Sequence, residues 1–557
     1  MRNVTNAAGV SIHVEKADAV TLLLAGATNY KNWDELGADP EARCESYLRA
    51  AGARSFAELK QRHLDDYQPR FRACGLELGT NAAPAQDTTA RLEQLRAGGT
   101  DPLFTVQYFQ YGRYLLLANS RPGTLAFNNH NVWLDDLRGR WRGRWTLNIN
   151  LEECYWPAES ANLPETSDAL LTFVENLAAS GRRTARELYG CRGWCAHHGT
   201  DLWMNTAMTD GATWGMTPMM GAWLLQSLWE HYRFDPDPRY LAKIYLLFKG
   251  AAEFGVDYLV EEPRHHWLVT CPSASPENSF RLADGGQNAL CAGPALDTEL
   301  LRDLFKECSE AAAKLGVDED WRAQLKATAA RLPPIQVGQT GRLLEWLEDY
   351  PEAEPQHRHI SHLYAAYPSA QITRRGTPEL AAAVRQVLAR RGDNLGWSAA
   401  WKINLYARLG DAASAYRVLR GMETEISIHP QKEDSNRVPS MEGNQGIQAY
   451  TAGVAEMLVQ SHGGEIELLP ALPKEWPSGS ARGLRARGGF TVDVAWKEGM
   501  LSSSTVRAKY AGPCRLRTAV PVTVRDSNKK IIGRRVDDET IEFPATANGA
   551  YSITPRL

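Results

Sequence analysis

The chain has 557 residues, more than a single ordinary hydrophobic core supports, so one large domain with smaller appendages is expected. Its 62 basic and 66 acidic residues give a net charge of −4 and are interspersed without long runs of one sign. This balance argues against a nucleic-acid or anionic-membrane surface and favours a small or neutral partner.

The start of the chain does not combine a basic stretch with an apolar one, and no apolar run of about 18 residues occurs. Neither a signal peptide nor a membrane helix is therefore predicted in the chain as given, and its localisation stays open. The nine cysteines form no CxxC or CxxxH pattern, and their odd number excludes complete internal pairing. Reduced, mostly buried thiols are expected.

The predicted elements change character along the chain. Residues 1–30 contain one or two short β-type runs and look like the remnant of an N-terminal β domain. Residues 31–102 carry apolar residues at a spacing of three to four, which predicts a helical linker. Residues 103–462 repeat amphipathic helical patterns between Gly- and Pro-rich loops, and residues 463–557 alternate as in an antiparallel β-sandwich. The expected fold class is mainly α with a small C-terminal β domain.

Two asparagines stand two residues apart in the stretch TLNINLEECYWPAE, residues 146–159. In a double ring of helices the loops at one end converge on a central pit, so a site there is assembled from distant segments. On an extended backbone Asn148 and Asn150 point to the same side and can hold one water or hydroxyl between their amides. The competing interpretation, that both amides only satisfy loop backbone, is commoner for an isolated pair.

The stretch CPSASPENSF, residues 271–280, places Glu277 between a proline and an asparagine on a loop with little helical character. A carboxyl group held there is expected to have a raised pKa and to serve as a general acid. A carboxylate at a helix start is the alternative, but the flanking Pro, Ser and Asn favour a loop.

A third segment, EWLEDYPEAEPQHRHISHLYAAYPSAQ, gathers three histidines downstream of Glu345. His359 and His362 are three residues apart and share a face if the segment is helical. Metal binding is one interpretation, although no cysteine set accompanies the histidines. Hydrogen bonding to a substrate is the preferred one.

A fourth segment, RVPSMEGNQGIQAYTAGVAEM, places Glu442 before a Gly-Asn-Gln-Gly loop that leads into an apolar helix. With Glu277 it supplies two carboxyl groups, and one protonated and one ionised carboxyl group are the minimum equipment for cleaving a glycosidic bond. The stretches GWCAHHGTDLWMNTA and RRGDNLGWSAAWKINLYARLG add the polar and aromatic mixture of a sugar pocket. Helix caps and core tryptophans are the alternative for those two stretches.

These stretches, together with YFQYGRYLLLANSRPG, resemble glycoside hydrolase family 95, the inverting α-L-fucosidases and related α-L-galactosidases. The resemblance runs from about residue 20 to beyond residue 469. It implies an (α/α)6 toroid barrel, preceded by a β-sandwich and a helical linker and followed by a small β domain. Of the N-terminal sandwich, the chain as given is expected to retain only remnant strands.

Carried over by position, the resemblance implies that Glu277 is the general acid and that Asn148 and Asn150 orient the catalytic water. The family's base is an aspartate in an Ile-Asp-Gly-Asn-Phe-Gly type of loop, and Glu442 stands in its place here. The added methylene moves the carboxylate by about 1.5 Å on an unchanged backbone. A misplacement of about 1 Å can cost a large factor in rate.

A second departure lies at GTLAFNNHNVWLDDLRGRW, where the family commonly has Asn-Leu-Gln-Gly-Ile-Trp and only Asn128 and Trp133 match. The sugar is therefore left open between fucose, L-galactose and a related residue. The polymer that carries this sugar is not encoded in any recognisable motif.

The sequence thus predicts an inverting glycoside hydrolase that removes terminal α-L-fucosyl or α-L-galactosyl residues from oligo- or polysaccharides without a cofactor or metal. The expected catalytic residues are Glu277, Glu442, Asn148 and Asn150. The expected substrate-binding residues are His197, His198, Trp203, Glu345, His359, His362, Asp393, Trp397 and Asn128. Two alternatives stay open: a non-catalytic carbohydrate-binding homologue, and a polysaccharide lyase with a His or Tyr base.

Overall fold

The computed structural model describes residues 2–6, 9–79, 86–128, 140–392, 396–426 and 445–556. The chain divides into two compact units, Met1–Arg70 and Phe71–Leu557. The first unit contains β1 (Arg2–Asn6), β2 (Gly9–His13), β3 (Tyr30–Asn32), β4 (Glu35–Leu36), α1 (Pro40–Gly52) and α2 (Phe56–Phe71), which ends in the second unit. Asp39 caps α1 by accepting hydrogen bonds from two backbone N–H groups at 3.0 Å. Neither α1 nor α2 buries a side chain.

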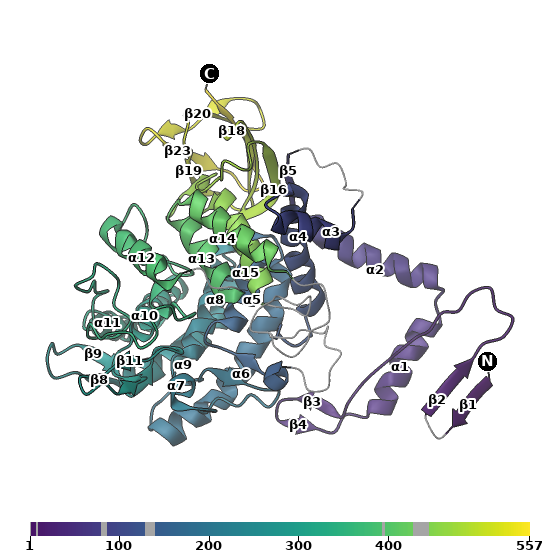
Figure 1. Ribbon diagram of the computed structural model, residues 1–557, viewed down its shortest axis with the longest axis horizontal. Coiled ribbons are helices and arrows are strands. Elements are labelled where there is room, and N and C mark those ends of the chain that lie inside the picture. The colour runs from purple at the N-terminus through teal and green to yellow at the C-terminus, as the bar shows by residue number, and fades with distance from the viewer. Residues whose placement is uncertain are drawn as a thin grey trace. The chain divides into compact units, whose positions relative to one another are not determined.

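Helices form the body of the second unit (Figure 1). They are α3 (Thr88–Arg96), α4 (Pro102–Asn119), α5 (Asn150–Ser160), α6 (Ser167–Tyr189), α7 (Ala212–Gly215), α8 (Met220–Phe234), α9 (Pro238–Tyr258), α10 (Ala295–Leu315), α11 (Glu319–Ala329), α12 (Pro378–Arg391), α13 (Trp397–Arg408), α14 (Ala412–Thr424) and α15 (Gln445–Leu458). α15 packs against α4, α5 and α13. Almost every described side chain of α5, α13 and α15 is buried, because these helices lie inside the array.

Aromatic side chains fill the centre of this array. Trp156 lies against Tyr367 and Trp401, with ring centroids 4.7 and 5.9 Å apart, and Trp223 lies 5.9 Å from Trp401. Trp223 and Trp401 are completely buried. Such pairs add packing energy beyond the area they bury. A share of the many tryptophans is therefore explained by the core rather than by contact with sugars.

The C-terminal part forms two packed sheets, as the alternating sequence predicts. One sheet has the order β21-β20-β24-β18-β17-β16-β5 and the other β14-β15-β19-β23-β22. Their strands are β5 (Gly75–Leu78), β14 (Val459–Gln460), β15 (Ile466–Leu468), β16 (Gly479–Ala486), β17 (Phe490–Lys497), β18 (Met500–Ala508), β19 (Gly512–Arg517), β20 (Val522–Arg525), β21 (Ile531–Ile532), β22 (Arg534–Arg535), β23 (Thr540–Ala545) and β24 (Ala550–Pro555). The chain as a whole is mainly helical with a C-terminal β domain, so the predicted fold class is confirmed.

One strand of the larger sheet comes from a segment that the sequence assigned to the helical linker. β5 pairs antiparallel with β16, with Leu76 opposite Ala481. Leu76 and Leu78 are buried while Glu77 is exposed, the alternation of a half-buried strand. The helical expectation is wrong here because four residues with a period of two are too few to stand out between two helices.

Buried charges join the helical body to the β domain at the C-terminal end of α5. Arg485 of β16 donates a hydrogen bond to Glu159 Oε2 at 2.5 Å, and His231 Nδ1 lies 2.6 Å from Glu159 Oε1. Burial raises the pKa of Glu159, but the charges of His231 and Arg485 outweigh burial and hold this pKa below its usual range. The two parts are thus connected by a paired, ionised carboxylate.

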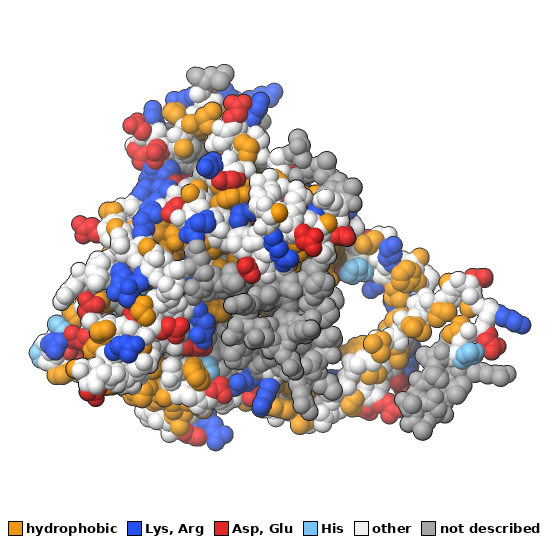
Figure 2. Space-filling view, in the orientation of Figure 1, with side chains coloured by type: hydrophobic (Ala, Val, Ile, Leu, Met, Phe, Trp, Pro, Cys, Tyr) orange, Lys and Arg blue, Asp and Glu red, His pale blue; other side chains and the backbone are white. Residues whose placement is uncertain are grey.

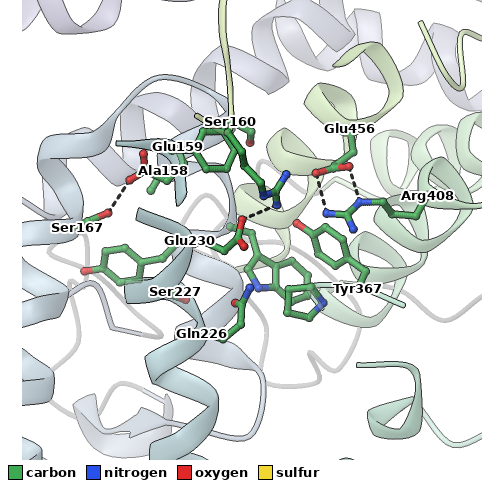
Figure 3. A pocket seen from close by; sticks show the side chains of 15 residues that line it. Ala158, Glu159, Ser160, Ser167, Gln226, Ser227, Glu230, Tyr367, Arg408 and Glu456 are labelled. Carbon is green, nitrogen blue, oxygen red and sulfur yellow. Dashed lines mark hydrogen bonds and ion pairs between the residues drawn. The ribbon is translucent and has the colours of Figure 1, made fainter. Parts of the chain in front are cut away.

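A small cavity of about 40 Å³ lies beside this junction (Figure 3). Glu230 and Glu456 face it, and Arg408 Nε donates to Glu456 Oε2 at 2.7 Å. Its lining mixes paired charged groups with apolar side chains, and its volume is large enough for an ordered water.

The outer face of the molecule carries both signs of charge. Figure 2 shows acidic and basic side chains interspersed over the helical body. Among the described helices, none has the length and apolarity needed to cross a membrane. All nine cysteines are unpaired; most are buried, whereas Cys271 is exposed.

The junction predicts a specific cost for removing one charge. Replacing Arg485 with Met leaves Glu159 with one cation instead of two in a buried site, and the free energy of unfolding should fall by about 3 kcal/mol. Urea unfolding followed by circular dichroism measures this change. Arg482→Met, an exposed position on the same strand, is the control and should change stability by less than about 0.5 kcal/mol. Equal effects of the two variants would contradict the role of the junction.

Candidate active site

A short two-stranded ladder places the asparagine motif beside the double-histidine motif. β6 (Trp145–Thr146) pairs antiparallel with β7 (Gly199–Thr200). Immediately after β6, the backbone N–H of Leu147 donates to the carbonyl of His198 at 2.6 Å. Asn148 and His198 are therefore neighbours although 50 positions separate them in the sequence.

The segment that carries Glu277 is a turn, as the sequence predicts. It lies between β10 (Ser273–Ala274) and β11 (Phe280–Arg281), and the N–H of Asn278 donates to the carbonyl of Ser275 at 3.0 Å. β10 pairs with β13 (Leu290–Cys291), and β11 pairs with β12 (Gln287–Asn288). Nearby, β8 (Leu259–Glu261) and β9 (Leu268–Thr270) form another hairpin.

Glu345 holds this turn from behind. Its Oε1 accepts from Ser275 Oγ at 2.8 Å, and its Oε2 accepts from Asn278 Nδ2 at 3.0 Å and from Arg391 Nη2 at 2.5 Å. Ser361, in the 3-10 turn Ser361–Leu363, donates to the carbonyl of Pro276 at 2.9 Å. Glu345 is buried and fully engaged, so it positions the residues on either side of Glu277 instead of facing a substrate.

Asn148 meets Glu277 directly. Its Nδ2 donates to Glu277 Oε1 at 3.0 Å, across 129 positions of sequence. Asn150 begins α5, and its Oδ1 accepts from Thr146 Oγ1 at 2.5 Å. The expectation that the two amides share one side of an extended backbone is wrong, because residues 147–149 form a turn into the helix.

Positive groups surround the other oxygen of Glu277. Its Oε2 contacts Arg358 Nη2 and lies 3.4 Å from His359 Nε2. Burial raises the pKa of Glu277, but the charges of His359 and Arg358 and the hydrogen bonds from His359 and Asn148 outweigh burial. The pKa of this carboxyl is held well below its usual range. The predicted raised pKa is therefore wrong for this arrangement, in which Glu277 is ionised.

Arg358 and Asp210 belong to the site but were not singled out from the sequence. Asp210 Oδ2 lies 3.4 Å from His198 Nε2 and accepts from Arg144 Nη1 at 3.1 Å. Burial lowers the pKa of His198, while the charges of Asp210 and Glu277 oppose this effect. The charges of two carboxylates thus act on His198. Arg358 had one available signal, its place between His357 and His359.

His359 forms an aromatic wall with its neighbours. It lies 4.6 Å from the ring of Trp397, edge to face, and 5.4 Å from His357. His359 Nδ1 is buried and has no partner among the described residues. No group of three or more His, Cys, Asp or Glu side chains able to hold a metal ion occurs in the described part of the chain.

Two predicted substrate-binding histidines are enclosed by protein. His197 Nδ1 lies 2.7 Å from the carbonyl of Thr206, and its Nε2 lies 2.6 Å from Tyr189 Oη. His362 is buried beside Glu345, 3.7 Å away. It does not share a helical face with His359, which precedes the 3-10 turn. Neither ring is placed to contact a sugar.

The remaining predicted residues lie at the edge of the site or outside the residues that the structure describes. Trp203 is 50% exposed, and Asn128 is partly buried. Glu442 and Asp393 lie outside the described residues.

The charge arrangement predicts how the Glu277 carboxyl titrates. Arg358→Gln removes a positive group in contact with Oε2, so the pKa of Glu277 should rise towards its usual range. The ¹³Cδ shift of glutamate-labelled protein measures this pKa, with Glu277→Gln identifying the resonance. Arg264→Gln, which removes an exposed partner of Glu348, should leave the pKa unchanged. The same pKa of Glu277 in the wild type, in Arg358→Gln and in Arg264→Gln would contradict the arrangement.

The sequence and the fold were compared with those of known proteins. Two relatives match most of this chain: "Alpha-L-fucosidase 2" of Arabidopsis thaliana, 36% identical over 522 residues, and "Probable alpha-fucosidase A" of Aspergillus niger, 29% identical over 515 residues. The alignments cover 90% and 86% of this chain but 61% and 64% of the relatives, so the chain spans less than two thirds of their length.

A solved structure named "Putative kojibiose phosphorylase from human microbiome" shares the fold, with a TM-score of 0.60 at 11% identity, covering 91% of this chain and 72% of that one. The model of the glycosyl hydrolase family 95 catalytic domain matches residues 55–458, and that of the family's C-terminal domain matches residues 460–553. Because these two matches cover most of the sequence, the chain belongs to glycoside hydrolase family 95.

Proposed function

We propose that this protein is a glycoside hydrolase that removes terminal α-L-fucosyl, or α-L-galactosyl, residues from oligo- or polysaccharides with inversion. Family membership and the fucosidase names of the two relatives support this proposal. The observation that carries it is the hydrogen bond between Asn148 and Glu277, because it brings the asparagine motif and the carboxyl motif to one point. The two groups must lie at one sugar-sized site to act on one glycosidic bond, the carboxyl at the leaving oxygen and the amide at the attacking water.

In the proposed reaction Glu277 gives its proton to the glycosidic oxygen while the bond from that oxygen to the anomeric carbon breaks. A water molecule attacks the opposite face of the anomeric carbon and gives its proton to the base, Glu442. Inverting enzymes keep their two carboxyl groups about 6.5–9.5 Å apart to make room for this water. Asn148 and Asn150 orient the water through amide oxygens and N–H groups.

A proton donor must be protonated, whereas Glu277 is ionised when Arg358 contacts it. Arg358 has the freedom to move, since its side chain is 51% exposed. A sugar that enters between Arg358 and Glu277 separates this pair and excludes water. Both changes raise the pKa of Glu277, because a nearby cation moves away and the burial that raises this pKa increases, while His359 stays beside the carboxyl. Substrate binding thus prepares the acid.

The proposed contacts of the sugar follow from the geometry. His359 offers the unpartnered Nδ1, and Trp397 offers a half-buried ring beside it. His198 lies next to both Asn148 and Asp210. Neutral sugars are recognised by such a combination of ring faces and directed hydrogen bonds.

One observation favours a second candidate, a carbohydrate-binding homologue without catalysis. Glu277 is ionised in the present arrangement, and the expected base is a glutamate in place of an aspartate. Such a protein would bind sugar in a saturable manner and release no product.

Replacement of Glu277 by Gln separates the two candidates. The amide cannot donate a carboxyl proton, so kcat for a fucosylated oligosaccharide should fall about 10³-fold. Hydrolysis of α-L-fucosyl fluoride should fall much less, because fluoride leaves without protonation. Initial rates of sugar release measure both. Glu348→Gln, a half-buried carboxylate of the same segment as Glu345, is the control and should keep wild-type rates. Equal losses on both substrates would argue against an acid role, and no release by the wild type would favour the binding homologue.

A further inference from the structure

A group of large apolar side chains is exposed close to the site. In the segment of residues 201–215, here called the rim segment, Trp203, Met208 and Trp214 are 50%, 45% and 41% exposed. An isolated exposed apolar side chain needs no explanation, but three within one short segment mark a contact surface. Of these three side chains, Trp214 has the best-defined packing against its neighbours.

The turn that carries Trp214 is closely packed. Trp214 lies in α7, which contacts β10, the strand that leads into the Glu277 turn. A Cβ placed on Gly211 would lie 3.4 Å from the indole, an ordinary van der Waals contact, so the ring lies beside that residue. A Cβ on Gly215 would lie 2.5 Å from the carbonyl oxygen of Thr209, so only glycine permits this close approach. The ring itself stays 41% exposed.

Asp210 connects the rim segment to the acid. Its backbone has φ +65°, an uncommon conformation for a residue with a side chain. Its Oδ2 accepts from Arg144 and lies 3.4 Å from His198 Nε2, and His198 neighbours Asn148, which donates to Glu277. These contacts run from Glu277 through Asn148 and His198 to Asp210, four residues before Trp214.

The position of a general acid fixes where the leaving group lies. The acid protonates the oxygen that stays with the leaving saccharide, so this saccharide must extend from the bond on the side of the acid. Here the rim segment offers the flat indole of Trp214 and the carboxylate of Asp210, and Arg144 adds a guanidinium bound to that carboxylate. A pyranose ring matches this set, because its C–H face packs on an indole and its hydroxyls bond to charged groups.

We infer that Trp214, together with Asp210 and Arg144, forms the subsite that binds the neutral saccharide released by the reaction. The inference rests on the proposed function, in which Glu277 is the acid. The rim segment then selects substrates by the saccharide to which the terminal sugar is attached. This selection does not depend on the terminal sugar itself.

The test compares two substrates in the full-length protein. One is an α-L-fucosylated lactose, whose leaving group is a disaccharide, and the other is α-L-fucosyl fluoride, whose leaving group is one atom. Trp214→Ala should lower kcat/KM for the trisaccharide about tenfold, mainly through KM, and change the fluoride rate less than about twofold. Trp214→Phe should restore most of the trisaccharide activity, because it keeps a flat ring. Leu246→Ala, an exposed apolar position on α9, is the matched control and should have no effect.

Binding of free lactose, measured by isothermal titration calorimetry, keeps this inference separable from the proposed function. The wild type should bind lactose more tightly than Trp214→Ala by a factor of about ten. If the wild type hydrolyses neither substrate, the proposed function fails, and the lactose measurement alone decides the subsite. Equal losses on both substrates, unchanged kcat/KM for the trisaccharide, or equal lactose affinity of wild type and variant would each overturn the inference.

Discussion

The candidate site depends on a buried ion pair between Glu345 and Arg391. The two side chains are 2.5 Å apart and almost completely buried. A lone charge in this position would be very costly, so Glu345 requires Arg391, which also contacts Glu352 at 3.0 Å. Glu345 uses its remaining hydrogen-bonding capacity on Ser275 and Asn278. The pair therefore fixes both sides of the turn that presents Glu277, and a carboxylate on a loop acquires the precision that a catalytic group requires.

The arginine in front of this turn differs from the one behind it in its exposure to solvent. Arg358 is half exposed and contacts Glu277 from the solvent side, whereas Arg391 is buried behind it. The buried arginine sets geometry, whereas His359 and the exposed Arg358 together hold the pKa of the acid low. A site built in this way holds its carboxylate still while its pKa depends on the groups in front of it.

The sequence predicted the repeated helices, the β domain and the turn at Glu277, because these depend on local periodicity and on proline. It also brought Asn148, His198, Glu277 and His359 into one candidate site, and the structure places them together. It could not predict that Asn150 begins a helix, since the turn before it is fixed by pairing with residues near His198. The strand β5 was missed because its partner β16 lies about 400 positions later. Arg358 and Asp210 act through contacts across loops, which no spacing reveals, and burial rather than residue type decided that His197 and His362 face protein.

The stereochemistry of the released sugar tests the account most directly. The anomeric proton of the product should be followed by NMR from the first minutes after the purified protein meets an α-L-fucosylated or α-L-galactosylated oligosaccharide. The account predicts that the β-anomer is formed first and that the α-anomer grows in later by mutarotation. Initial release of the α-anomer would contradict the inverting arrangement of acid and water at Glu277 and Asn148, and absence of any release would contradict hydrolysis itself.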